Sequence, residues 1–295
     1  MKVRFAVSVG LGGPDPDQLA QVVPEAETRG FDSLWFSDLP MLAAADPLLA
    51  VAFAASRSER LKLGVNLVPF GYEPFVFARQ VAQLDQLSGG RLLVTVVPGL
   101  DQPGERTALG IAGAHRGRLL DQLLPDLRAW WAGEAVVPAG AAEGTEPVAL
   151  AVRPVQDPLE VWLGGRGPEA VSRAGRLADG WLGSLTAAPA EVAAIRSGIE
   201  AAATAAGRTI DPEHFGLSIP YARTVDDRDA IGRLRRPGGT DLSGLVPVGR
   251  DALRDLVGRL VDDGMSKFVV RAVGPIGSWS DELDWLADAV LDLQT

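Results

Sequence analysis

LKLGVNLVPFGYEPFVFARQVAQLDQLSGGR, residues 61–91, contains one complete strand-then-helix unit. The β-rich apolar run at its start, residues 61–69, predicts a buried strand. The longer stretch after it predicts a helix that ends at Gly89 or Gly90, because glycine readily takes the left-handed conformation of a helix C-terminus. A strand followed directly by a helix is the repeating unit of parallel α/β folds.

The same order recurs along the chain, with further predicted strands at 3–9, 33–38, 91–99, 160–165, 179–184, 215–222 and 267–273. These runs are apolar on both faces, as expected where helices cover one face and a barrel interior covers the other. Eight units of about 37 residues each fit a (β/α)8 barrel. We therefore predict an α/β fold that forms a single TIM-like barrel domain over residues 1–295.

Two stretches exceed the average unit and predict insertions after the fourth and the seventh strand. Residues 133–159 are rich in Gly, Pro and Ala, which indicates a loop or a small hairpin. Residues 223–248 indicate a short helix and a mobile segment before the next main helix. Insertions that follow barrel strands lie at the C-terminal face, where lids and substrate walls form, so we expect both insertions there.

The composition narrows the class of protein. The chain has no cysteine and only two histidines, which excludes disulfides, thiolate metal sites and a three-histidine zinc site, so we predict no metal. A net charge of −10 argues against a nucleic-acid or anionic-membrane surface. No apolar stretch reaches the roughly 18 residues of a membrane span. We expect a cytoplasmic protein whose partner is a small molecule.

A glycine-rich turn follows the predicted fifth strand in VWLGGRGPEAVSRAG, residues 161–175. Gly164, Gly165 and Gly167 let backbone N–H groups approach a ligand, and Pro168 suits the first position of a helix whose N-terminal dipole favours an anion. A phosphate fits such a turn. Two alternatives stay open: a tight turn that simply needs positive φ values, and a loose match to the dinucleotide-binding fingerprint of a Rossmann fold.

Several segments together resemble the bacterial luciferase-like monooxygenase family, which includes flavin-dependent monooxygenases and F420-dependent oxidoreductases. They are GFDSLWFSD (30–38), the opening segment (61–91), ALG (108–110), RGRLLDQLLPDLRAWWAG (116–133), VWLGGRGPEAVSRAGRLADGW (161–181) and VGRDALRDLVGRLVDDGMSKFVVR (248–271). The resemblance implies a TIM-like barrel that binds FMN or the deazaflavin F420 at the C-terminal ends of its strands. It also implies a homodimer.

The resemblance assigns the cofactor site to two places. The cofactor phosphate is expected on Gly164, Gly165, Arg166 and Gly167, and one face of the ring is expected against a backbone bulge, often with a cis peptide bond, at Val65, Asn66 and Leu67. Asn66 can instead be a polar group that is satisfied inside the barrel, and Arg166 can be solvated. The glycine turn and the asparagine-containing strand favour F420, with FMN as the alternative.

The second predicted strand departs from the family pattern. Relatives usually carry Ser-Asp-His there, whereas this chain reads Ser37-Asp38-Leu39 and lacks the histidine that lies near the reactive centre of several F420 enzymes. The remaining candidates for catalysis are Asp38, at a strand end, and Tyr221, as a proton donor or substrate contact. A structural carboxylate and an ordinary core tyrosine are the alternatives for these two residues.

These features predict an oxidoreductase in which the cofactor carries the chemistry and the protein positions a small organic substrate for hydride transfer. An FMN-dependent monooxygenase that uses O₂ is one alternative. A degenerate barrel that binds a ligand without redox turnover is another, because the histidine is missing.

Overall fold

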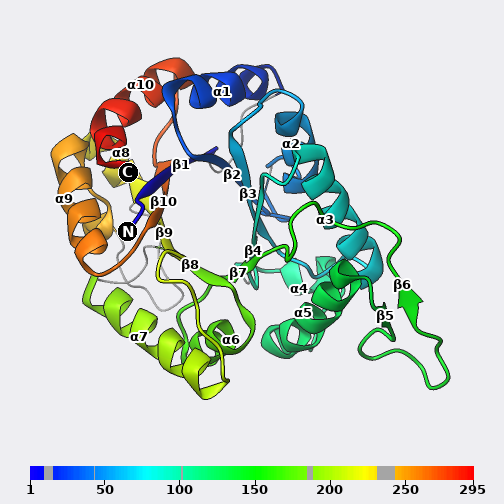
Figure 1. Cartoon of the computed structure of the whole chain (residues 1–295). Coiled ribbons are helices and arrows are strands. Elements are labelled where there is room, and N and C mark those ends of the chain that lie inside the picture. Colours follow the sequence, from blue (N-terminus) through cyan, green and yellow to red (C-terminus); the bar gives the residue numbers. More distant parts are fainter. Residues whose placement is uncertain (10–15, 43, 101, 185–188, 231–242) are drawn as a thin grey trace.

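The computed structural model describes residues 1–9, 16–42, 44–100, 102–184, 189–230 and 243–295. Within them, eight parallel strands close into a barrel in the order β1-β10-β9-β8-β7-β4-β3-β2 (Figure 1). The strands are β1 (Arg4–Ser8), β2 (Ser33–Ser37), β3 (Lys62–Leu67), β4 (Leu92–Val96), β7 (Val161–Leu163), β8 (Gly180–Ser184), β9 (Phe215–Tyr221) and β10 (Lys267–Ala272). The predicted TIM-like barrel is confirmed.

A ring of helices surrounds this barrel (Figure 1). The main helices are α1 (Pro16–Arg29), α2 (Pro47–Ala55), α3 (Pro74–Ser88), α5 (Arg116–Ala132), α6 (Pro168–Leu177), α7 (Pro189–Ala205), α9 (Gly249–Asp262) and α10 (Trp279–Val290). Shorter elements are α4 (Glu105–Ala108), α8 (Val225–Ala230), η1 (Ser243–Leu245) and η2 (Leu291–Leu293). Gly89 ends α3 in the left-handed region, with φ 65°, as the sequence predicts. No described helix combines the length and the apolar character that a membrane span requires.

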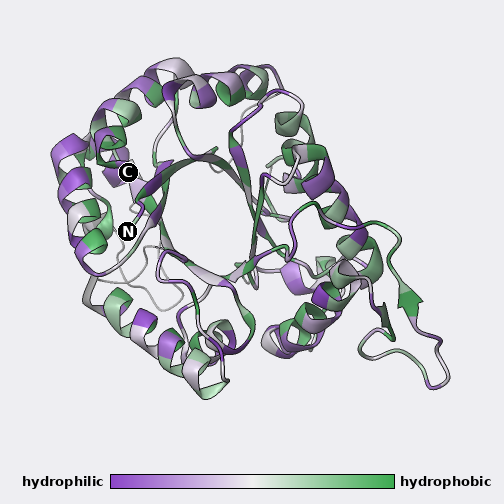
Figure 2. Ribbon diagram, in the orientation of Figure 1, coloured by the Kyte–Doolittle hydropathy of each residue, from purple (hydrophilic) through white to green (hydrophobic). Residues whose placement is uncertain are grey.

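Side chains on alternate strand positions face two different cores. A small cluster of Ala6, Trp35, Trp162, Leu182 and Val269 fills the barrel interior, and a much larger cluster lies between the strands and the helices. Figure 2 shows the apolar residues of the helices gathered on their barrel-facing sides. Gly64 makes room for the indole of Trp35, because a Cβ atom at Gly64 would lie 2.1 Å from Trp35 Cε2. The inner face is therefore packed tightly around two tryptophans.

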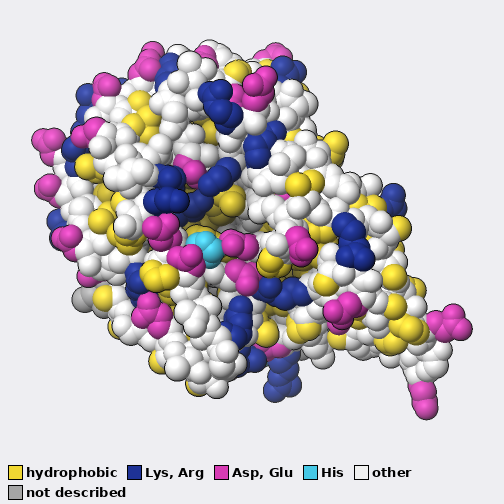
Figure 3. Space-filling view, viewed as in Figure 1, with side chains coloured by type: hydrophobic (Ala, Val, Ile, Leu, Met, Phe, Trp, Pro, Cys, Tyr) yellow, Lys and Arg dark blue, Asp and Glu magenta, His cyan; other side chains and the backbone are white. Residues whose placement is uncertain are grey.

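The N-terminal ends of the strands carry buried charge. Lys267 Nζ and Lys62 Nζ each lie 3.4 Å from a carboxylate oxygen of Asp32. Burial alone would raise the pKa of Asp32, but the two ammonium groups outweigh burial and hold that pKa below its usual value. Figure 3, which looks onto this face, shows Lys and Arg side chains around the centre.

The predicted insertion at 133–159 forms a two-stranded antiparallel hairpin of β5 (Ala135–Val136) and β6 (Val148–Ala149), which projects from the barrel (Figure 1). It follows helix α5 and leads into β7, so it lies at the N-terminal ends of the strands, and our expectation of the C-terminal face was wrong. The buried carboxylate of Asp85 fastens the chain after the hairpin by accepting the backbone N–H groups of Val155 and Gln156, at 2.7 and 2.9 Å. This segment therefore does not border the barrel mouth.

The second predicted insertion, 223–248, contains α8 as the expected short helix and then η1. Its central part, residues 231–242, lies outside the described residues, and with it the segment predicted to be mobile.

Candidate cofactor and substrate site

The glycine turn lies where β7 ends and α6 begins, as the sequence predicts. Gly165 has φ +104°, and its carbonyl oxygen accepts a hydrogen bond from Trp181 Nε1 at 2.8 Å. A Cβ atom on Gly165 would lie 2.8 Å from Ala170 Cβ. The backbone conformation and the close packing of the turn thus explain Gly165 without a ligand.

Gly167 has a different role in the same turn. It is the residue before α6, with an extended backbone at φ −68° and ψ 158°, and a Cβ atom there would meet nothing within 4 Å. The first backbone N–H of α6 to make a helical hydrogen bond is that of Val171, which donates to the carbonyl oxygen of Gly167 at 2.9 Å. The earlier amides of Glu169 and Ala170 precede any intrahelical acceptor, so both are available as donors at the start of α6.

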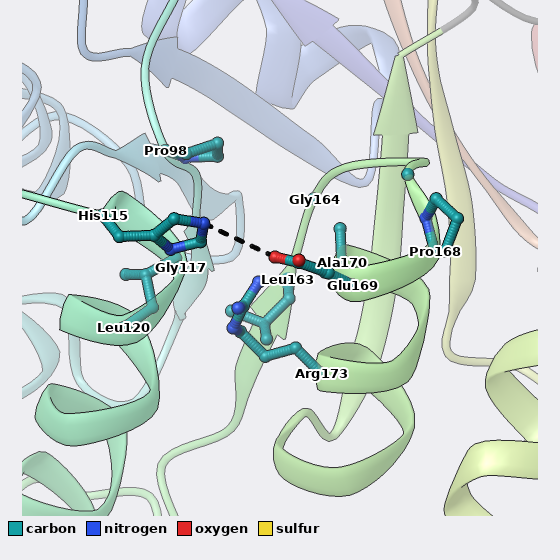
Figure 4. A pocket seen from close by; sticks show the side chains of 11 residues that line it. Pro98, His115, Gly117, Leu120, Leu163, Gly164, Pro168, Glu169, Ala170 and Arg173 are labelled. Atoms are coloured by element: carbon teal, nitrogen blue, oxygen red, sulfur yellow. Dashed lines mark ion pairs between the residues drawn. The ribbon is translucent and has the colours of Figure 1, made fainter.

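A pocket of about 540 Å³ opens between the N-terminal ends of α5 and α6 (Figure 4). We call it the α5/α6 pocket, and it is lined by Pro98, His115, Gly117, Leu120, Leu163, Gly164, Gly167, Pro168, Glu169, Ala170 and Arg173. Two of the four predicted phosphate-binding residues, Gly164 and Gly167, line it. Arg166 does not: its Nη1 lies 3.9 Å from Glu191 Oε2 on the side of α7.

The ionisable side chains that line the α5/α6 pocket each have a nearby partner. His115 Nδ1 accepts the backbone N–H of Arg118 at 3.3 Å, and His115 Nε2 faces Glu169 Oε2 across the pocket at 3.6 Å (Figure 4). Arg173 Nε lies 2.9 Å from Asp121 Oδ1. An anion in this pocket would therefore be held mainly by backbone amides, and the exposed side chain of Glu169 would have to turn away from it.

Asn66 lies at the C-terminal end of β3 and is tied to the neighbouring strand. The side-chain Nδ2 of Asn66 donates to Ser37 Oγ at 3.1 Å, and the backbone carbonyl oxygen of Asn66 accepts the backbone N–H of Asp38 at 2.8 Å. Asn66 thus faces the barrel interior, whereas the side chains of Val65 and Leu67 are buried in the outer core. Strand pairing stays regular through Leu67, and the cis peptide bond found in the described residues is Asp157–Pro158, so the expected bulge and cis bond are not seen at Val65–Leu67.

Asp38 occupies the end of β2 in a partly buried setting. Its Oδ2 accepts the backbone N–H of Val68 at 3.1 Å, which orients the carboxyl group. Burial, together with the nearby carboxylates of Asp46 and Glu105, raises the pKa of Asp38 from 3.8 to about 6, against the lowering effect of that hydrogen bond. A carboxyl group with this pKa exchanges its proton close to neutral pH, which suits acid–base catalysis.

Tyr72 is a neighbour of Asp38 that the sequence analysis did not single out. Its hydroxyl lies 3.5 Å from Asp46 Oδ2, and burial, followed by the charges of Asp38 and Asp46, raises its pKa. One signal was available in the sequence, since Tyr72 is one of only two tyrosines and follows a strand end within a few residues.

Tyr221 does not reach the barrel mouth, where a proton donor would have to lie. The predicted role of Tyr221 as a proton donor is therefore wrong. The side chain is fully buried, its hydroxyl donates to Glu282, and its ring stacks on Trp285 with centroids 5.3 Å apart. Both partners belong to α10. Positions alternate along β9, so Tyr221 points out toward the helices, which the alternative of an ordinary core tyrosine describes.

A closed parallel barrel with pockets formed by the segments that follow its strands is the architecture of a TIM-barrel enzyme. A family model described as luciferase-like monooxygenase matches residues 1–242. The chain therefore belongs to the luciferase-like monooxygenase family.

Curated proteins of known activity are similar to this chain. The F420-dependent glucose-6-phosphate dehydrogenase of Nakamurella multipartita is 28% identical over 234 residues, which are 71% of this chain and 64% of that protein. The 5,10-methylenetetrahydromethanopterin reductase of Methanolobus tindarius is 26% identical over 214 residues, which are 72% of this chain and 63% of that protein. The matched regions thus span a little under two thirds of these relatives.

Solved structures share the fold at low sequence identity. An F420-dependent secondary alcohol dehydrogenase in complex with an F420-acetone adduct aligns over 100% of both chains, with a TM-score of 0.81 and 16% identity. The monooxygenase RslO1 from Streptomyces bottropensis aligns over 99% of both chains, with a TM-score of 0.79 and 21% identity. These likenesses establish the barrel and its topology.

Proposed function

We propose that this protein is an oxidoreductase that uses F420 to transfer hydride to or from a small organic substrate. The observation that carries the proposal is the α5/α6 pocket, which lies at the predicted glycine turn and presents unpaired helix amides to an anion. The F420-dependent relatives named above favour F420. The likeness to RslO1 favours the second candidate, an FMN-dependent monooxygenase that uses O₂.

The residues of the pocket fit a cofactor phosphate. Gly167 leaves open space beside the amides of Glu169 and Ala170, and any side chain at Gly164 would crowd Val97, whose Cγ1 would lie 3.0 Å from the added Cβ. When bound, F420 supplies a hydride acceptor or donor on its ring. Gly164 and Gly167 would hold its phosphate at the helix N-terminus, and Asn66 would line the barrel mouth beneath the ring.

Asp38 is the residue that we assign to proton transfer. Its raised pKa keeps part of the population protonated near neutral pH. In substrate reduction the carboxylic acid would donate a proton to the developing alkoxide, and in the reverse direction the carboxylate would accept it. The hydrogen bond from Val68 holds the carboxyl group in one orientation for this proton transfer.

Substitutions at Gly167 test the phosphate position. Gly167→Asp and Gly167→Asn both fit the open space, and both provide a helix cap, so the two variants should fold equally well. Only aspartate adds negative charge, and two like charges about 4 Å apart repel by up to about 4 kcal/mol near a protein surface. We expect the aspartate variant to bind F420 roughly 100- to 1,000-fold more weakly than the asparagine variant.

The measurement is a titration of wild type and both variants with F420 and with FMN, followed by absorbance. Tight F420 binding by wild type and by Gly167→Asn, with loss in Gly167→Asp, supports the proposal. Binding of FMN alone, with oxygen consumption, supports the monooxygenase. Failure of wild type to bind either cofactor leaves only a barrel that binds ligands without redox turnover.

We also propose that the chain works as a single domain, as a homodimer and in the cytoplasm, because the family resemblance implies a dimer and the lack of cysteine suits a reducing compartment. Light scattering of the purified protein measures the oligomeric state directly, and a monomer at micromolar concentration would contradict the dimer.

A further inference from the structure

Arg271 lies on the inner face of strand β10, close to its C-terminal end. Phe268 and Val270 belong to the outer core, whereas Val269 belongs to the cluster that fills the barrel interior. Since side chains alternate along a strand, Arg271 shares the inner face with Lys267 and Val269. It is the residue of that face nearest to the barrel mouth.

The guanidinium of Arg271 has no counter-charge in the described part of the chain. It makes no hydrogen bond or ion pair there, although the residue is partly buried, and burial alone lowers its pKa. Other shielded cations have partners: Lys267 faces Asp32, and Arg173 faces Asp121. Removing a cation from water without a partner opposes folding, so a site of this kind points to a bound anion.

The strand order places Arg271 away from the α5/α6 pocket and nearer to Asp38. Strand β10 is separated from β2 by β1 alone, whereas β9 and β8 lie between β10 and β7. With strands about 4.8 Å apart, the ends of β2 and β10 are roughly 10 Å apart. An arginine side chain can therefore contact one end of a small molecule whose other end lies beside Asp38.

We propose that Arg271 binds an anionic group of the substrate, a carboxylate or a phosphate. This inference rests on the proposed function, because it takes the reacting end of the substrate to lie beside Asp38 and the cofactor ring. The planar guanidinium presents two parallel N–H donors that match a carboxylate or phosphate edge. Arg271 is thus a specificity residue that selects acidic substrates over neutral ones of the same shape.

The test compares three ring compounds that differ in charge: benzoate, phenyl phosphate and neutral benzamide. Their binding to F420-loaded wild type, Arg271→Met and Arg271→Lys is measured by isothermal titration calorimetry. Arg223→Met is the matched control, because Arg223 follows the neighbouring strand and already pairs with Glu282 at 3.0 Å. The loss of a charge-assisted contact predicts about 10- to 100-fold weaker binding of benzoate or phenyl phosphate to Arg271→Met.

Benzamide should bind Arg271→Met and wild type equally, Arg271→Lys should recover part of the anion affinity, and the control should bind all three compounds as wild type does. The anion that shows the larger loss identifies carboxylate or phosphate as the recognised group. Wild type that binds neither anion, or an equal loss for benzamide, overturns the inference. A loss of F420 affinity in Arg271→Met overturns it as well, because Arg271 would then bind the cofactor.

Two further measurements keep the inference testable. Should Arg271→Met fail to fold, benzoate binding to wild type must still weaken with added inorganic phosphate while benzamide binding does not, and equal effects on both contradict the inference. The F420 titration of wild type reports separately on the proposed function. F420 binding without anion binding removes only the role of Arg271, and absence of F420 binding removes the proposed function itself.

Discussion

Replacing Asp38 by asparagine separates the two effects of its raised pKa. Asparagine is nearly isosteric, and its side-chain oxygen can still accept the N–H of Val68, so the change removes ionisation and little else. Well below pH 3.8 the carboxyl group is protonated in both the folded and the unfolded chain, and it contributes nothing to the pH dependence. Between pH 4 and 6 the unfolded chain ionises first, so ionisation favours unfolding.

The size of this effect follows from the pKa. A rise of the pKa from 3.8 to about 6 lowers the free energy of unfolding by roughly 3 kcal/mol at most above pH 6, since one pKa unit is about 1.4 kcal/mol. Partial exposure of the carboxyl group to solvent reduces this to about 1 kcal/mol. We therefore expect Asp38→Asn to be about 1 kcal/mol more stable than wild type at pH 8 and equally stable at pH 4, as measured by urea unfolding at both pH values.

The same variant tests the role of Asp38 in proton transfer. In wild type the turnover rate should change with pH around an apparent pKa near 6, and this change should be absent from Asp38→Asn, whose rate should also be lower. Asp46→Asn is the matched control: it keeps the cap of α2 but removes one charge that raises the pKa of Asp38, so the change should move to lower pH. If Asp38→Asn is less stable than wild type at pH 8, or gains equal stability at pH 8 and pH 4, the proposed effect of the raised pKa of Asp38 is refuted.

Two further substitutions test the packing of the barrel. Gly64→Ala places a methyl group 2.1 Å from the ring of Trp35, and such overpacking should cost about 1 to 3 kcal/mol in urea unfolding; an unchanged midpoint would mean that the indole has room to move. Tyr221→Phe should leave turnover unchanged and cost about 1 to 2 kcal/mol of stability, because Glu282 loses a buried donor; a large drop in turnover at full stability would restore Tyr221 as a catalytic group.

The barrel and the glycine turn could be predicted because each depends on local sequence. Strands alternate with helices at a regular spacing, and Gly165 and Gly89 mark backbone conformations that other residues rarely adopt. The position of the 133–159 insertion was misjudged because the segment was counted from the preceding strand. Helix α5 lies between them, and passing one helix moves the chain to the opposite end of the barrel.

The direction of side chains at the strand ends could not be predicted in the same way. In a parallel barrel both faces of a strand are apolar, so the hydrophobic pattern does not reveal which alternate positions face the interior. Tyr221 and Arg271 both lie near the end of a strand, yet Tyr221 contacts α10, whereas Arg271 shares its strand face with Val269 of the inner cluster. Only the neighbours of each strand, such as the inner cluster around Trp35, fix that choice.

Strand β10 itself shows why the missing counter-charge of Arg271 is informative. Lys267 and Arg271 lie on one face of one strand, four positions apart, and burial lowers the pKa of both. At the closed N-terminal end the fold provides a carboxylate, Asp32, beside Lys267. At the open end the described residues provide none for Arg271. The fold thus supplies a counter-charge for Lys267 at one end of the strand. The absence of one for Arg271 at the barrel mouth is therefore better explained by a ligand that carries an anionic group than by loose packing.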